Sequence, residues 1–100
     1  MLKRIVKMEF DPARVPEFLD NFRRNRAHIQ AFPGCRHLEL LRDTEHAHVF
    51  FTFSVWDDAA ALEAYRRSEL FRRVWAATKP LFAARPLAWS VTEVAPQADG

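Results

Sequence analysis

The sequence of 100 residues contains one cysteine, only two glycines, and no apolar run long enough to cross a membrane or to act as a signal peptide. Because Cys35 stands alone, no internal disulfide can form, and we expect a reducing, cytoplasmic setting. The scarcity of glycine argues against a glycine-rich loop that binds nucleotide phosphates. The 15 basic residues nearly balance the 13 acidic ones, so we expect neither a nucleic-acid nor a membrane partner.

Apolar residues, by contrast, are plentiful: 49% of the chain is hydrophobic and 13% is aromatic. A chain of this length is long enough for one domain with a core of its own. We expect residues 1–95 to form that domain and residues 96–100 to form a disordered tail, because hydrophobic periodicity is lost there. So many aromatic rings indicate a lined cavity or a large subunit contact in addition to an ordinary core.

The periodicity predicts six main elements. Strands are expected over residues 2–10, 35–42, 49–56 and 87–94, and helical segments over residues 15–32 and 57–82. The sequence Phe32-Pro33-Gly34 ends the first helix, and Ser68 is expected to interrupt the second helical segment as a new cap. This order is the split βαβ, ferredoxin-like α+β arrangement, in which both helical segments cover one face of a four-stranded antiparallel sheet and the first and third strands are central.

The strand over residues 49–56 is apolar on both faces. Phe51 and Phe53 point to one side of the sheet, whereas Phe50 and Trp56 point to the other. An antiparallel strand in a small domain usually keeps one face polar, and the helices here can cover only one face. The second face therefore needs a partner subunit, a bound ligand, or both.

Three polar residues border the apolar stripe of the first helix, at spacings of three and four: Asn21, Asn25 and His28. Their side chains can face a cavity between helix and sheet and form hydrogen bonds with a phenolic or quinone oxygen. His28 can also act as a base, since imidazole titrates near neutral pH. The plain alternative is a solvated or partly buried helix edge.

A set of aromatic residues can form the walls of a pocket: Trp56, Tyr65, Phe71, Trp75 and Trp89. Flat rings bind a flat, conjugated ligand by offset stacking, which contributes about 0.5–1.5 kcal/mol per pair beyond area burial. The alternative is ordinary core packing, above all for Phe71 and Trp75. Tyr65 is the candidate for chemistry, although its phenol titrates near pH 10 and makes a poor base.

The remaining polar candidates are weaker. His37 and Glu39 share one strand face, where a carboxylate can orient an imidazole, or where both simply lie near a subunit contact. Glu45, His46 and His48 lie on a hairpin turn and offer three possible metal ligands. The sequence shows no fourth ligand, so we expect no metal site there. Cys35 follows a turn glycine and is expected to pack as a small hydrophobic side chain.

Four stretches together resemble the antibiotic biosynthesis monooxygenase family, whose members are dimeric α+β barrels. They are Phe32-Pro33-Gly34-Cys35, Leu38-Glu39-Leu40, the stretch from Phe53 through Trp56-Asp57, and the pattern Leu62…Tyr65…Ser68…Phe71. The resemblance implies a homodimer in which two sheets join face to face, which would cover the second face of the sheet, that of Phe50 and Trp56. It also implies membership of a group that includes cofactor-independent oxygenases of polyphenols and quinols, haem-degrading oxygenases and an isomerase of a signalling sugar.

The sequence departs from this family at four positions. Many members carry histidine where Tyr65 and Leu70 stand, and the haem-degrading branch has its axial histidine where Trp75 stands. That branch also has an asparagine near the position of Lys7. Without an imidazole at position 75, haem ligation by that route is not available.

Three hypotheses follow. The first is a cofactor-independent monooxygenase that acts on a small aromatic molecule of the quinol or polyphenol kind, with Tyr65 in the place of the family's imidazole. The second is a homodimer that binds a small apolar molecule without catalysis, which the replaced histidines favour. The third is an RNA-binding module, because Phe51 and Phe53 have the spacing of base-stacking aromatics, although the glycines of that signature are missing.

Overall fold

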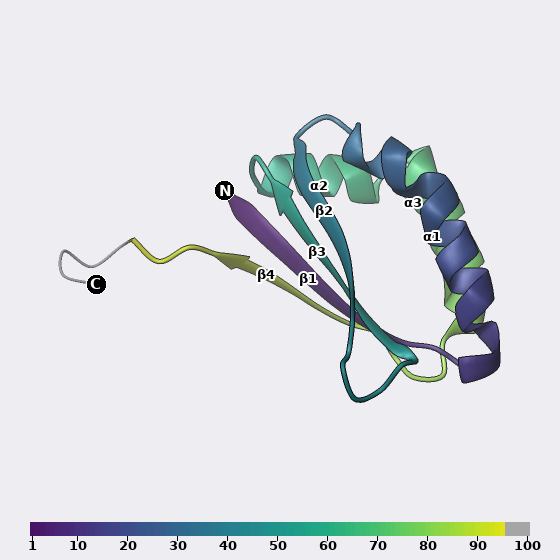
Figure 1. The fold of residues 1–100 in the computed structure, drawn as a ribbon. Coiled ribbons are helices and arrows are strands. Elements are labelled where there is room, and N and C mark those ends of the chain that lie inside the picture. Colours follow the sequence, from purple (N-terminus) through teal and green to yellow (C-terminus); the bar gives the residue numbers. More distant parts are fainter. Residues whose placement is uncertain (96–100) are drawn as a thin grey trace.

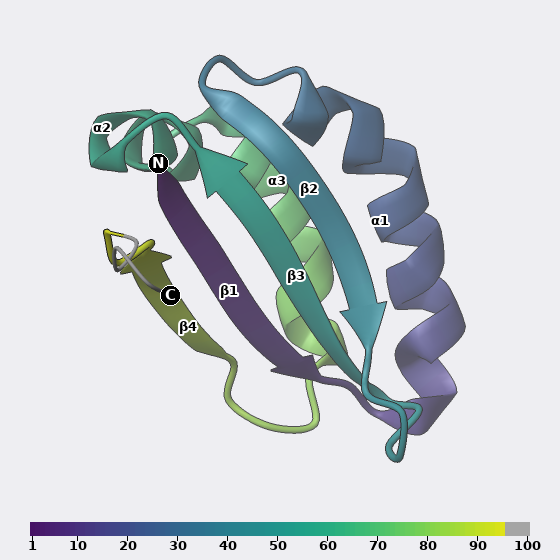
Figure 2. The ribbon, with the colours of Figure 1, turned by 60° about the vertical axis from the view of Figure 1, so that its left-hand side comes forward.

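The computed structural model describes residues 1–95, and their strands form one antiparallel sheet with the helices on one side of it (Figure 1). The strands are β1 (Leu2–Glu9), β2 (Cys35–Arg42), β3 (Val49–Trp56) and β4 (Leu87–Thr92). Their order in the sheet is β2-β3-β1-β4, so β1 and β3 are central (Figure 2). The predicted ferredoxin-like α+β fold is confirmed. The tail that we predict over residues 96–100 lies outside the described residues.

The helices begin and end where the local chemistry predicts. They are α1 (Val15–Gln30), α2 (Ala59–Arg66) and α3 (Glu69–Thr78), with short 3-10 turns at Pro12–Arg14 and Lys79–Leu81. The Asp58 carboxylate accepts a hydrogen bond from the Ala61 backbone N–H at 2.8 Å and caps α2. The Ser68 hydroxyl accepts one from the Phe71 N–H at 3.1 Å and caps α3, which confirms the predicted interruption at Ser68.

Aromatic side chains fill one end of the space between helices and sheet. Phe10 stacks on Phe18 with 4.0 Å between the ring centroids, and Phe18 also contacts Phe50 at 5.2 Å. Phe10, Phe50, Trp56 and Leu81 are the largest fully buried side chains. The expectation that Phe50 and Trp56 need a partner's cover is therefore wrong: both face the helices. Alternation could not decide this, because β3 is apolar on both sides and only the packed helices distinguish them.

We define the outer sheet face as the side of the sheet that is turned away from the helices. No helix of residues 1–95 covers it (Figure 1). Its residues are Lys3, Ile5, Lys7, His37, Glu39, Leu41, Phe51, Phe53, Val55, Leu87, Trp89 and Val91. Phe53 lies opposite Ile5, which in turn lies opposite Trp89, so an apolar row crosses the sheet. Trp89 is 45% exposed and Leu87 is 47% exposed. Contiguous apolar surface of this kind marks an interaction site on a folded protein.

The turn between α1 and β2 packs against the start of α2. Gly34 has a φ of +88°, in the left-handed region that glycine adopts without steric cost. A Cβ atom at this position would lie 2.5 Å from the Cβ of Ala61. The Gly34 carbonyl accepts a hydrogen bond from the Asp57 N–H at 2.9 Å, and the Asp57 carboxylate pairs with the Arg36 guanidinium. Glycine is therefore required here for both its backbone conformation and its lack of a side chain.

The substitution Gly34→Ala tests this requirement. We expect the free energy of unfolding, measured by urea denaturation, to fall by about 2–4 kcal/mol, because backbone strain and overpacking each contribute about 1–3 kcal/mol. In an Ala61→Gly background the same substitution should cost less, since the close contact is removed and only the strain remains. An equal cost in both backgrounds would show that the contact with Ala61 contributes nothing.

Candidate functional site

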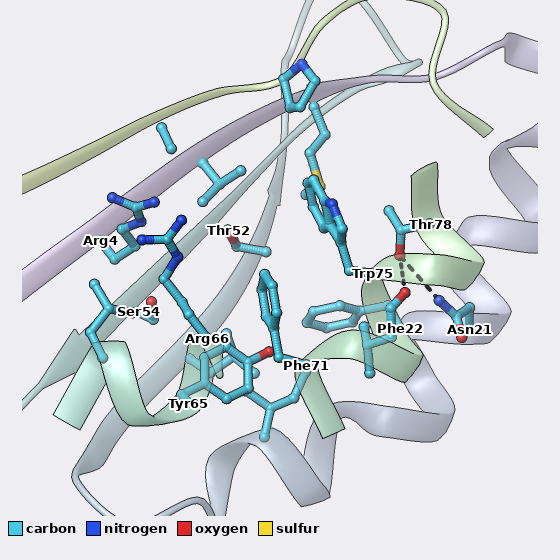
Figure 3. A pocket seen from close by; sticks show the side chains of 18 of the residues that line it. Arg4, Asn21, Phe22, Thr52, Ser54, Tyr65, Arg66, Phe71, Trp75 and Thr78 are labelled. Atoms are coloured by element: carbon cyan, nitrogen blue, oxygen red, sulfur yellow. Dashed lines mark hydrogen bonds between the residues drawn. The ribbon is translucent and has the colours of Figure 1, made fainter. Parts of the chain in front are cut away.

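A cavity of about 330 Å³ lies between the sheet and the helices, beside the filled aromatic core (Figure 3). Its space arises from small side chains on the inner face of the sheet. Between the large Phe50 and Trp56, this face of β3 carries only Thr52 and Ser54, and β4 contributes only Ala88. The cavity has a volume typical of small-molecule sites, which begin at about 300 Å³.

One wall of the cavity is a continuous series of aromatic rings. Trp56 stacks on Tyr65 with centroids 5.0 Å apart, the edge of Phe71 meets Tyr65 at 5.2 Å, and Phe71 stacks on Trp75 at 5.8 Å. The Trp56 indole N–H donates to the Ser54 hydroxyl oxygen at 3.0 Å, which holds this ring in one orientation. The structure thus brings together four of the five aromatic residues that we predict for the pocket.

The Tyr65 hydroxyl is the most distinctive polar group of this wall. Burial raises the pKa of Tyr65 from its ordinary value near 10 to about 12. At neutral pH the side chain is therefore a neutral phenol that donates a hydrogen bond and does not act as a base. None of the hydrogen bonds among residues 1–95 involves this hydroxyl, and it remains free to bind a ligand oxygen.

Asn21 connects α1 to α3 beside the cavity, and Asn25, also on α1, binds Asn21. The Asn21 amide donates to the Thr78 hydroxyl oxygen at 3.3 Å, and the Thr78 hydroxyl donates to the Val74 carbonyl at 2.7 Å. The Asn25 amide donates to the Asn21 carbonyl at 2.8 Å and to the Asn21 side-chain oxygen at 3.1 Å. Asn21 lines the cavity, whereas Asn25 does not. This network holds the two helices in register where they border the cavity.

Besides Asn25, the structure places two further predicted site residues outside the cavity. His28 is exposed to solvent, because it precedes the buried Ile29 and lies roughly 100° around the helix from it. Trp89 lies on the outer sheet face, because its neighbour Ala88 lines the cavity and successive strand residues alternate between faces. Neither side chain can contact a ligand in this cavity.

Two arginines at the cavity edge were not among the predicted residues. Arg4 lies on β1 with Val6 and Met8 on the inner face of the sheet, and Arg66 is the last residue of α2. Arg4 donates to the Ser90 hydroxyl at 2.9 Å. Burial first, and the charge of Arg66 second, lower the pKa of the Arg4 guanidinium. The sequence signal that could have identified Arg4 is a charged residue on an otherwise apolar face of the first strand.

The weaker polar candidates lie apart from the cavity. The His37 imidazole and the Glu39 carboxylate are 2.9 Å apart on the outer sheet face. Burial raises the pKa of the Cys35 thiol, which makes it a poor nucleophile. Within residues 1–95, no group of three histidine, cysteine, aspartate or glutamate side chains is placed to hold a metal ion. Nor does that part of the chain contain a helix with the length and apolarity to cross a membrane.

Comparisons with known proteins agree on the fold. A family model described as antibiotic biosynthesis monooxygenase matches residues 1–77. Among solved structures, an antibiotic biosynthesis monooxygenase of 22% sequence identity matches with a TM-score of 0.89, over 94% of this chain and 99% of that chain. A conserved protein from Methanosarcina mazei Go1, 15% identical, matches with a TM-score of 0.89 over 93% of this chain and 92% of its own.

A protein from Pseudomonas aeruginosa is 24% identical and matches with a TM-score of 0.83, over 94% of each chain. At these identities the structural likeness concerns the fold alone. A search of curated proteins finds no significant match.

Titration of the single tyrosine tests the described environment. In the folded protein we expect the tyrosinate absorbance at 295 nm to develop with a midpoint near pH 12, against about 10 in the urea-unfolded chain. Because the folded-state pKa is the higher one, the contribution of Tyr65 to stability is complete below pH 10 and is lost between pH 10 and 12. Near-ultraviolet circular dichroism, recorded in parallel, follows the fold. A folded-state midpoint near 10 would contradict the buried position of Tyr65.

Proposed function

This chain belongs to the antibiotic biosynthesis monooxygenase family, and from that premise we propose that it is a cofactor-independent monooxygenase whose substrate is a small, flat phenol or quinol. The aromatic wall formed by Trp56, Tyr65, Phe71 and Trp75 is the observation that carries the proposal. A conjugated ring system can stack against these rings, while a polar substituent meets the Tyr65 hydroxyl. Residues 1–95 would act as one catalytic domain.

The proposed reaction needs only the substrate and dioxygen. An electron-rich phenolate reacts with dioxygen at a ring carbon that carries hydrogen. One oxygen atom becomes the new carbonyl oxygen of a quinone, and the other leaves as water with the two hydrogens that the phenol has lost. The substrate supplies both reducing electrons, so that no flavin, haem or metal is required. The cavity between helices and sheet would hold the rings in place and shield the reactive intermediate from water.

Each residue of the site has a role in this proposal. The neutral Tyr65 hydroxyl would donate a hydrogen bond to a substrate oxygen and stabilise the negative charge that develops there. Phe71 and Trp75 would bind the ring faces, and Asn21 with Asn25 would keep α1 and α3 at the spacing that the ligand needs. We assign no catalytic role to His28, since its side chain is exposed to solvent.

We also propose that two copies pair through their outer sheet faces, as the family resemblance implies. Support comes from the apolar row that includes Phe53, Ile5 and Trp89, which no helix of residues 1–95 covers (Figure 1). The two aromatic residues that an RNA-binding module would need, Phe51 and Phe53, belong to this same face. We further propose a cytoplasmic location, which is consistent with a single cysteine.

A second candidate function is binding of the same kind of aromatic molecule without catalysis. Two points favour it. The family resemblance implies a histidine where Tyr65 and Leu70 stand, and the lining of this cavity, within residues 1–95, includes no histidine, aspartate or glutamate. A site of this composition lacks a side chain that accepts a proton at neutral pH.

Oxygen uptake distinguishes the two candidates. With 1,5-dihydroxynaphthalene as the probe, a monooxygenase consumes oxygen and forms a quinone chromophore, whereas a binding protein only quenches tryptophan fluorescence. Tyr65→Phe should lower kcat/KM about fivefold to tenfold, because one hydrogen bond contributes about 1 kcal/mol. Arg73→Gln, on the exposed side of α3, is the matched control. Binding without oxygen uptake would refute the oxygenase proposal and leave the second candidate.

The dimer is tested at the centre of the outer sheet face. Phe53→Asp introduces a charge that pairing would bury, so we expect this variant to sediment as a monomer at micromolar concentration while the wild type sediments as a dimer. Ala27→Glu, on the exposed side of α1, should leave the dimer intact. A monomeric wild type would refute pairing through this face.

A further inference from the structure

We propose that Arg4 and Arg66 form an anion-binding pair at the edge of the cavity, and that the ligand of this cavity is a flat aromatic molecule that carries a carboxylate. This inference rests on the proposed function, because it places the aromatic part of the ligand against the same wall of rings. It adds the charge of the ligand, which the family resemblance does not supply.

The two guanidinium groups reach the same cavity from a strand of the sheet and from a helix that covers it. Arg4 comes from the inner face of the central strand β1, and Arg66 comes from the C-terminal end of α2. Figure 3 shows the two guanidinium groups together, on the sheet side of Tyr65. A ligand whose rings contact Tyr65 can therefore extend a substituent toward both cations without leaving the cavity.

Arg4 has few partners for a partly buried cation. Its one side-chain hydrogen bond within residues 1–95 is to the neutral Ser90 hydroxyl, and its guanidinium has no carboxylate within ion-pair distance there. A guanidinium has five N–H donors in a planar fork, so most of them remain available. An arginine on the helix-facing side of a sheet usually pairs with a carboxylate, and no carboxylate among residues 1–95 pairs with Arg4.

Arg66 adds a second positive charge that is only weakly balanced. Glu63 lies 3.5 Å from Arg66, but the same carboxylate also pairs with Arg67 at 3.1 Å. Burial and the charge of Arg66 both lower the pKa of Arg4, which agrees with two cations close together beside apolar walls. A carboxylate placed between them would relieve the repulsion and accept the free N–H donors, with the bidentate geometry that arginine favours.

A pair of matched ligands tests the inference by binding alone. 2-Naphthoate and 2-naphthamide share size and shape, differ in charge, and are not oxidised under the assay conditions. By isothermal titration calorimetry we expect the wild type to bind the naphthoate at least tenfold more tightly than the amide. Arg4→Gln should remove most of this preference, Arg4→Lys should keep part of it, and Arg73→Gln should keep all of it.

The outcomes separate this inference from the proposed function. Equal affinity of the wild type for both ligands overturns the anion site while leaving the aromatic cavity in place. A loss of affinity for both ligands in Arg4→Gln also overturns it, because Arg4 would then act only in packing. Preference for the naphthoate in a protein that consumes no oxygen supports the anion site and refutes the oxygenase. If neither ligand binds the wild type, the anion site is overturned, and oxygen uptake with 1,5-dihydroxynaphthalene still decides the proposed function.

Discussion

The alternation of side chains along β3 is the constraint on which the other features of this molecule depend. Phe50 and Trp56 point toward the helices and anchor the two ends of the core, while Phe51 and Phe53 point away from it. Between the two anchors, the inner face carries only small polar residues, and these leave the space that becomes the cavity. One strand thus sets the core, the cavity and the open apolar face.

The space between helices and sheet has two different halves. Near the start of α1, stacked phenylalanines and Leu81 exclude solvent and fill the volume. Toward α2, the rings line a hollow instead of filling it, and Tyr65 keeps a free hydroxyl there. The hydrogen bond between Asn21 and Thr78 joins α1 to α3 beside this hollow. The chain therefore keeps a preformed cavity without losing a packed core.

Membership of the family accounts for the fold but not for the chemistry of this site. The same architecture supports several functions, so function must be argued from the residues that line the cavity. Here a neutral phenol and two guanidinium groups line the cavity. Such a set stabilises negative charge on a ligand rather than removing its protons, and it favours a substrate that is already acidic or already ionised.

Local sequence determined the order of the elements and most of their ends. The caps at Asp58 and Ser68 and the turn at Gly34 depend on hydrogen bonds and backbone angles within a few residues, so they could be predicted without knowledge of the fold. The clustering of Trp56 with Tyr65 could also be anticipated, since both are aromatic residues on elements that follow one another.

Tertiary structure alone decided which face of the sheet the helices cover, and hence that Phe50 is core while Trp89 is not. The tertiary structure also turned His28 to solvent and brought Arg4 close to Arg66 at the edge of the cavity. These outcomes depend on the packing of segments far apart in the chain, between two sheet faces that are both apolar. The alternation within one strand shows which residues share a face. Only the contacts made by the other segments select the face that is buried.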